Sequence, residues 1–161
     1  GQYGLGPTGF SLAFAVNAIG FFSASQLAGW LGERWGMRSL VRRGVAGFVF
    51  FSAAIFVTAL VTDPGLYLVM AGLFCANACL GVVVPTVMVV ALDDHGDIAG
   101  LASSLGGTLQ MVAGGLSIAL AGPFFDGSVT PMLGAIAACG LVAALLTLAL
   151  LRPRPMAEPT V

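Results

Sequence analysis

Charged residues are scarce in this sequence. Asp, Glu, Lys and Arg make up 8% of it, whereas 58% of the residues are apolar and the mean hydropathy is +1.02. A soluble globular domain usually has about 25% charged residues. The composition therefore excludes an ordinary soluble domain and is typical of an integral membrane protein, with the lipid bilayer as its first expected partner.

Lysine is absent, and the six basic residues are all arginine. The net charge is −1, so the chain has no basic face for nucleic acid, and no nucleic-acid partner is expected. Four of the arginines lie between residues 29 and 43, and the other two are Arg152 and Arg154. In membrane proteins, arginines in short loops mark the cytoplasmic side. The positions of the arginines therefore indicate how the chain is oriented across the membrane.

Residues that could carry catalysis or bind a metal are also few. The single histidine, His95, lies in a short acidic stretch whose aspartates do not have the spacing of a calcium loop. Cys75, Cys79 and Cys139 all fall inside apolar runs, where a thiol behaves as a small apolar residue. No nucleophile has a base partner. We expect no enzyme, no metal site and no cofactor.

Five uncharged apolar runs are long enough to cross a bilayer as helices, which takes roughly 20 residues. They cover residues 10–31, 44–62, 66–91, 98–121 and 131–151. The connections are too short for separate domains. The predicted fold is an all-α membrane protein with one transmembrane bundle of five helices over residues 1–151, followed by a disordered polar tail over 152–161.

The basic segments follow the first and the fifth run. Odd crossings end on the same side of a membrane, so both segments are expected in the cytoplasm and Gly1 outside. The chain begins with Gly1 and shows no signal peptide, and we expect it to be part of a longer protein. No Asp, Glu, Lys, Arg or His lies within any of the five runs, so groups that carry protons are expected elsewhere.

Polar and small residues gather on single faces of three runs. In residues 98–121 they recur at steps of three and four, which places them on one side of a helix. The polar members on these faces are Asn17, Asn77, Ser103, Gln110 and Ser117. Small residues at helix contacts favour close packing as the explanation, but a face toward a water-filled or substrate-filled cavity stays open. The runs 44–62 and 131–151 are apolar nearly all round and are expected to face lipid.

The end of the first run and the segment that follows it have a recognisable spacing of glycines and charges. It is carried by Gly29, Glu33, Arg34, Gly36 and Arg38. This spacing resembles the cytoplasmic loop motif of major facilitator superfamily transporters.

Two further stretches resemble the bicyclomycin and chloramphenicol resistance (Bcr/CflA) branch of that superfamily. One is the aromatic, glycine and proline run at residues 3–10 that leads to Asn17. The other joins residues 91–93 to residues 99–107, and it is similar to the family's entry to its eleventh helix.

The resemblance implies that the five runs are helices eight to twelve of a twelve-helix transporter, a partial C-terminal half whose partner is the missing set of N-terminal helices. Helices eight, ten and eleven of that fold line a central cavity, so the five polar residues named above become candidate substrate contacts. The implied activity is proton-coupled multidrug efflux by an antiporter of the bacterial cytoplasmic (inner) membrane, with antibiotic resistance as its outcome. The alternatives are a metabolite transporter of the same superfamily and a membrane assembly module that does not transport.

Overall fold

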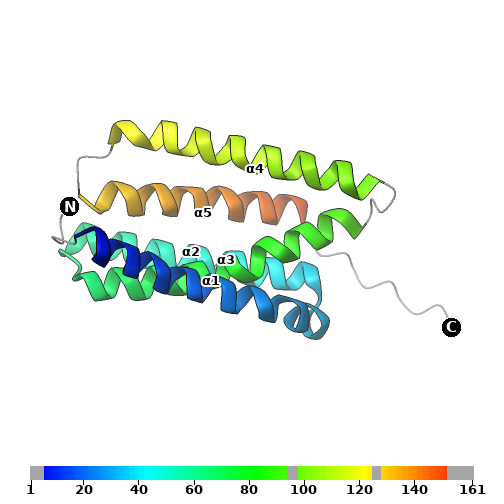
Figure 1. The fold of residues 1–161 in the computed structure, drawn as a ribbon, viewed down its shortest axis with the longest axis horizontal. Helices are drawn as coiled ribbons and strands as arrows, with labels where there is room; N and C mark the ends of the chain where they lie inside the picture. Colours follow the sequence, from blue (N-terminus) through cyan, green and yellow to red (C-terminus); the bar gives the residue numbers. More distant parts are fainter. Residues whose placement is uncertain (1–5, 94–97, 125–127, 152–161) are drawn as a thin grey trace.

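The computed structural model describes residues 6–93, 98–124 and 128–151, and within these ranges the chain is helical with short connections (Figure 1). The elements are α1 (Pro7–Trp35), α2 (Met37–Val61), α3 (Leu66–Asp93), α4 (Ala99–Ala121), the short 3-10 helix η2 (Gly122–Phe124) and α5 (Thr130–Leu150). Five of the described helices are long and apolar enough to cross a membrane, judged by length and composition. The predicted all-α membrane fold class is confirmed. The predicted disordered tail, residues 152–161, lies outside the described residues.

The helices extend beyond the predicted runs, and the segment predicted as a cytoplasmic loop is almost entirely helical. α1 continues to Trp35 and α2 begins at Met37, so Gly36 alone joins them. Gly36 has a φ of +80°, a conformation that side chains other than glycine adopt at a cost. A hydropathy pattern detects only the part of a helix that lies in hydrocarbon, which is why the charged ends were assigned to a loop.

Arginine side chains at this corner lie on aromatic rings. The Arg34 guanidinium carbon is 5.5 Å from the centre of the Trp30 ring, and that of Arg43 is 4.9 Å from the centre of the Trp35 ring. Such cation–π contacts stabilise arginine where an aromatic surface is available. They also explain how the helices continue into a strongly basic stretch.

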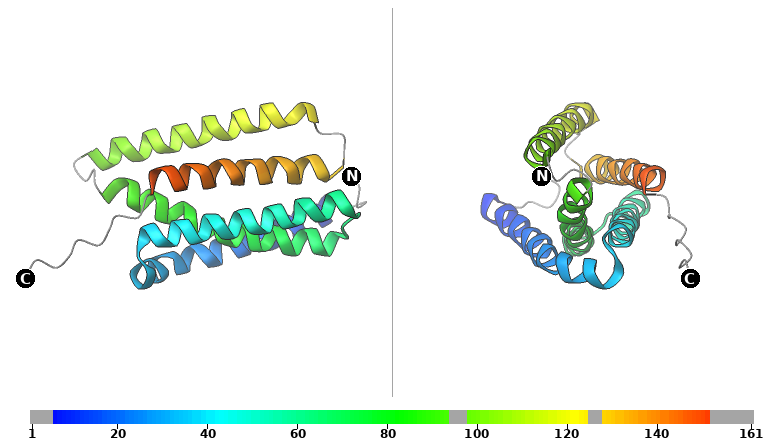
Figure 2. Two further views of the ribbon diagram at one scale, coloured as in Figure 1. Left: turned by 180° about the vertical axis from the view of Figure 1, so that it is seen from behind. Right: turned by 90° about the vertical axis from the view of Figure 1, so that its right-hand side faces the viewer.

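α3 occupies the middle of the bundle. Seen end-on in Figure 2, α3 lies between α1 and α2, α5 lies beside α2, and α4 stands apart from the other helices. α3 continues through Pro85, and its last part rises toward the start of α4 (Figure 1). The bundle is therefore tight at α1, α2, α3 and α5 and open at α4.

The buried core lies among α2, α3 and α5. One cluster joins Val41 and Val45 of α2 to Val83 of α3, and the other joins Ile55, Val69 and Leu133 from all three helices. α2 and α5 were expected to face lipid. The structure leaves them exposed on one side only, because their other sides pack against each other and against α3. The all-round apolar pattern could not show this, since lipid and a neighbouring helix are both apolar surroundings.

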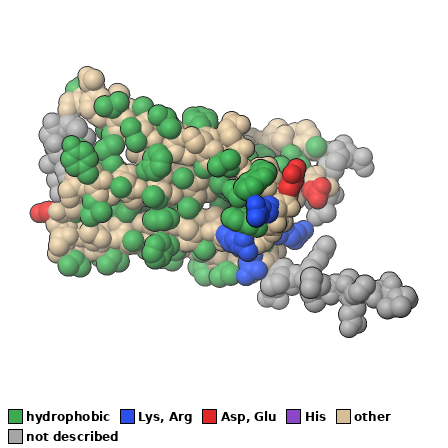
Figure 3. Space-filling view, turned by 90° about the horizontal axis from the view of Figure 1, so that it is seen from below, with side chains coloured by type: hydrophobic (Ala, Val, Ile, Leu, Met, Phe, Trp, Pro, Cys, Tyr) green, Lys and Arg blue, Asp and Glu red, His purple; other side chains and the backbone are tan. Residues whose placement is uncertain are grey.

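The charged side chains of the described residues lie at the ends of the bundle. Figure 3 shows the arginine side chains of the described residues together at one end, and a wide middle zone without charged side chains. That end carries the arginines of the α1–α2 corner, and Glu33 and Asp93 lie at the ends of α1 and α3. The arrangement matches a bilayer, which accepts charges at its two surfaces and not in its core.

Candidate functional site

A cleft of about 330 Å³ lies between α2, α3, α4 and α5. Its wall is mostly apolar and holds no charged side chain among the residues that line it. The residues that matter for its chemistry are Phe48 of α2, Asn77 of α3, Ser117 of α4, and Met132, Ile136 and Cys139 of α5. Cavities of this kind, apolar with few polar groups, are typical of sites for small molecules.

Asn77 is the main polar group of the cleft, and it is tied to α1. Its Nδ2 donates a hydrogen bond to Oδ1 of Asn17 at 3.2 Å, and Nδ2 of Asn17 donates to the backbone oxygen of Ala13 at 3.0 Å. Both amides are half-buried. Asn77 uses one amide hydrogen in this bond, so its second hydrogen and its carbonyl oxygen remain for a molecule in the cleft.

Ser117 of α4 lines the same cleft as Asn77. Its hydroxyl donates to the backbone oxygen of Ala113 at 2.8 Å, as serine commonly does within a membrane helix. The hydroxyl oxygen keeps lone pairs that can accept a hydrogen bond. The cleft therefore offers one donor and two acceptors in apolar surroundings, which suits a neutral or weakly polar ligand.

The other predicted cavity residues lie elsewhere. Asn17 is beside Asn77 at the α1–α3 contact, whereas Ser103 bonds the backbone oxygen of Gly100 in its own helix at 3.1 Å. Gln110 is exposed on α4 and is not among the residues that line the cleft. The structure thus brings together Asn17, Asn77 and Ser117, and a substrate contact by any of the five residues stays a prediction.

α4 has no neighbour along most of its length. None of its residues, all of which the structure describes, is buried. A Cβ added at Gly107, Gly114 or Gly115 would meet nothing within 4 Å. At the α1–α3 contact, in contrast, a Cβ added at Gly81 would overlap the backbone oxygen of Phe21. The two small-residue faces therefore differ, because one is packed and the other is open.

The sequence did not point to the α5 side of the cleft. Met132, Ile136 and Cys139 line it, but α5 is apolar all round and gives no periodic signal for the side that faces the cleft. Among the described residues, no three His, Cys, Asp or Glu side chains lie close enough to hold a metal ion.

The residues of the predicted loop motif lie at the joint between α1 and α2. Gly29, Glu33 and Arg34 are exposed on the last turns of α1, Gly36 is the joint, and Arg38 is exposed at the start of α2. The motif is thus presented on two helix ends that meet at a sharp turn. The motif and the Asp63 turn, which joins α2 to α3, lie at opposite ends of α2.

Comparison with known proteins gives one informative relative. No protein-family model matches the chain, and no solved structure matches it significantly. The chain is 28% identical over 120 residues to an uncharacterized MFS-type transporter, YdgK, of Bacillus subtilis (strain 168). The aligned part is 74% of this chain and 30% of that protein, so the chain spans under a third of its relative. Together with the five apolar helices, this similarity supports a multi-pass membrane protein with a transporter-type role, related to the major facilitator superfamily.

Proposed function

We propose that this chain forms helices eight to twelve of a twelve-helix major facilitator transporter of the Bcr/CflA type. The complete protein would export drugs or other small lipophilic molecules by alternating access, in which two halves rock around a site near the bilayer midplane. The similarity to an MFS-type transporter supports the superfamily. The observation that carries the substrate class is the uncharged cleft with Asn77 and Ser117 in its wall.

The chemistry of the cleft argues for lipophilic cargo. An anion or a strongly polar metabolite would need charged or multiple polar partners to replace its water, and the residues that line the cleft supply none with charge. A volume of about 330 Å³ is at the small end of ligand pockets, which run from roughly 300 to 1,000 Å³. This chain would therefore form one wall of a larger site, with the N-terminal helices supplying the other.

Proton coupling would depend on that other half. The acids that the structure describes are Glu33, Asp63 and Asp93. Glu33 and Asp93 lie at the ends of α1 and α3, and Asp63 lies in the turn between α2 and α3. A carboxylate that exchanges protons during transport has to lie within the membrane, near the substrate path. In this proposal the proton carriers belong to helices one to seven.

The proposed orientation follows the arginines. The end of the bundle that holds Arg34, Arg38, Arg42 and Arg43 would face the cytoplasm of a bacterial cell, in the inner membrane. The end of α5 would lie on that side too, and the start of α1 would face out.

Another function has one specific observation in its favour. The open face of α4, with Gly107 and Gly114, could pack against a different membrane protein, and the chain would then be an assembly module without transport activity. A metabolite transporter of the same superfamily is the other alternative. Efflux by the complete protein separates the three possibilities.

The test uses the complete gene product, expressed in a drug-sensitive bacterium, with ethidium efflux and drug resistance as readouts. Ser117→Phe should fill the cleft and Asn77→Ala should remove its amide, and both should lower efflux at unchanged membrane level. Ser104→Ala is the matched control, because Ser104 is exposed on α4, bonds its own helix and does not line the cleft. Normal efflux in both variants would exclude the cleft as the site. A wild-type protein that exports no drug but transports a polar metabolite would favour the metabolite transporter.

A further inference from the structure

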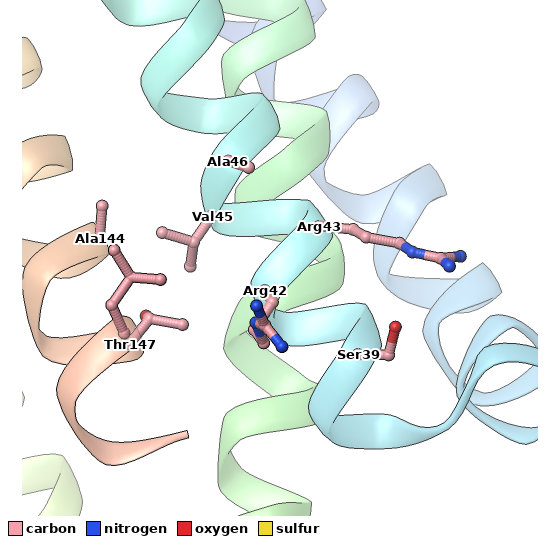
Figure 4. A pocket seen from close by; sticks show the side chains of 8 residues that line it. Ser39, Arg42, Arg43, Val45, Ala46, Ala144 and Thr147 are labelled. Carbon is pink, nitrogen blue, oxygen red and sulfur yellow. The ribbon is translucent and has the colours of Figure 1, made fainter. Parts of the chain in front are cut away.

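A second hollow lies at the arginine end, on the outer side of the α2–α5 contact. It measures about 460 Å³ (Figure 4). Its lining residues are Ser39, Arg42, Arg43, Val45, Ala46, Ala144, Thr147 and Leu148. α2 and α5 form its two walls. It shares no lining residue with the cleft described above.

The outer part of this groove is cationic. Figure 4 shows Arg42 between α2 and α5, whereas Arg43 points away from α5 and toward α1, where its guanidinium lies over the Trp35 ring. No ion pair or hydrogen bond joins the exposed Arg42 to any residue that the structure describes, and no acid lines the groove. A guanidinium has five N–H donors suited to phosphate oxygens. Within the described part of the chain, Arg42 is therefore a cation without an ion-pair partner beside an open space.

The inner part of the groove is apolar. Val45, Ala46 and Ala144 lie one turn deeper along their helices than Arg42 and Thr147, toward the middle of the bundle. Figure 4 shows Val45 pointing from α2 toward Ala144 and Thr147 of α5. Two alanines leave room there for a hydrocarbon chain.

A cation at the membrane surface above an apolar slot matches the shape of one kind of molecule. We propose that this groove binds an anionic phospholipid, with the headgroup phosphate on Arg42 and an acyl chain along Val45, Ala46 and Ala144. Basic pockets between membrane helices bind such headgroups by charge, and the acyl chain adds apolar contact. The inference needs only that the arginine end lies at a membrane surface, so it does not depend on what the protein transports.

The test measures lipid binding to the complete protein in detergent by native mass spectrometry. Dioleoyl phosphatidylglycerol should bind, and dioleoyl phosphatidylcholine, which has the same chains and no net charge, should bind several-fold more weakly. Arg42→Gln should weaken phosphatidylglycerol binding about fivefold, the effect expected for one arginine near an anionic headgroup. Arg34→Gln is the matched control, because it removes the same charge from the same end but lies outside the groove.

A second pair of variants tests the acyl slot. Ala46 is exposed, so Ala46→Leu should fold normally and reduce lipid binding by filling the groove. Ala54→Leu, at an exposed alanine two turns further along α2 and outside the groove, should leave it unchanged. Equal binding of the two lipids, or equal loss in Arg34→Gln and Arg42→Gln, would overturn the proposal in favour of diffuse attraction. Competition by millimolar inorganic phosphate would overturn it in favour of a free anion site.

Discussion

Replacing Gly81 with alanine should separate α1 from α3. Gly81 is buried on α3 at the point where the backbone of α1 passes closest, and a Cβ there would overlap the carbonyl oxygen of Phe21. The obstacle is backbone, so no side chain can turn aside to make room. The helices themselves have to move apart.

The structure sets the size of the effect. A carbon–oxygen contact needs roughly 3.3 Å, so the helices must separate by on the order of 1 Å at Phe21. Forced overpacking of this kind costs about 1–3 kcal/mol. The Asn77–Asn17 hydrogen bond lies one turn away on both helices and is already 3.2 Å long, so we expect its loss to add about 0.6 kcal/mol. Relative to a glycine-to-alanine change at an open helix position, which shares the gain in helix propensity, the free energy of unfolding should fall by about 2–4 kcal/mol.

Thermal unfolding in detergent can measure this loss with a dye that fluoresces on reaction with thiols. Cys75 and Cys79 are half-buried on α3 and become reactive when the helices separate. The midpoint of unfolding should drop on the order of 5–10 °C in Gly81→Ala. Gly107→Ala is the control, since a Cβ there meets nothing within 4 Å and alanine favours a helix. If Gly81→Ala unfolds at the same temperature as Gly107→Ala, the close contact between α1 and α3 is refuted.

Three further outcomes follow from the same geometry. A double-mutant cycle of Asn17→Ala and Asn77→Ala should give a coupling of about 0.6 kcal/mol in thermal unfolding, and additive effects would show that the two amides do not pair. Gly36→Ala should lower the free energy of unfolding by about 1–2 kcal/mol because Gly36 has a positive φ, and Gly36→Asn should lower it less. In the complete protein in membranes, a small water-soluble maleimide should modify Cys139, which is exposed and lines the cleft, faster than the half-buried Cys79. Equal rates, measured by mass spectrometry, would exclude water from the cleft.

The sequence predicted the helices well because a bilayer imposes a simple rule. An uncharged run of about 20 residues has to be helical there, since no water is present to satisfy its backbone. The rule does not define where each helix ends, because the helix ends lie outside the hydrocarbon core, where water can satisfy the backbone. For that reason Glu33 and Arg38 were assigned to a loop, although the structure has them in α1 and α2.

The contacts between helices were harder to predict, since composition alone does not reveal partners. Asn17 and Asn77 were placed on small-residue faces, and packing and a cavity were both left open. In the structure they bond to each other across the α1–α3 contact, as the packing interpretation predicts. Asn77 also lines the cleft, and its contact with water or a substrate there stays a prediction. Gly81 and Gly107 are equivalent in sequence terms, yet only Gly81 has a helix against it.

The open face of α4 links this packing pattern to the proposed function. In lipid, helices gain nothing from hydrophobic burial, so small residues promote contact only where a neighbour approaches closely. α1 and α3 use their small-residue faces in this way. α4 has the same kind of face around Gly107 and Gly114, with Gln110 exposed beside it, and nothing in the described part of the chain covers it.

An amide in hydrocarbon without a partner is costly, and Gln110 gains one only from another helix or from water. Both are supplied if α4 faces a second half of a transporter across a cavity, and the same arrangement would close the cleft at Ser117. If the chain is instead an assembly module, the partner protein would supply a helix against α4, but no water-filled cavity would lie beside it. Water at Cys139 is therefore the observation that separates the two, because Cys139 and Ser117 line the same cleft.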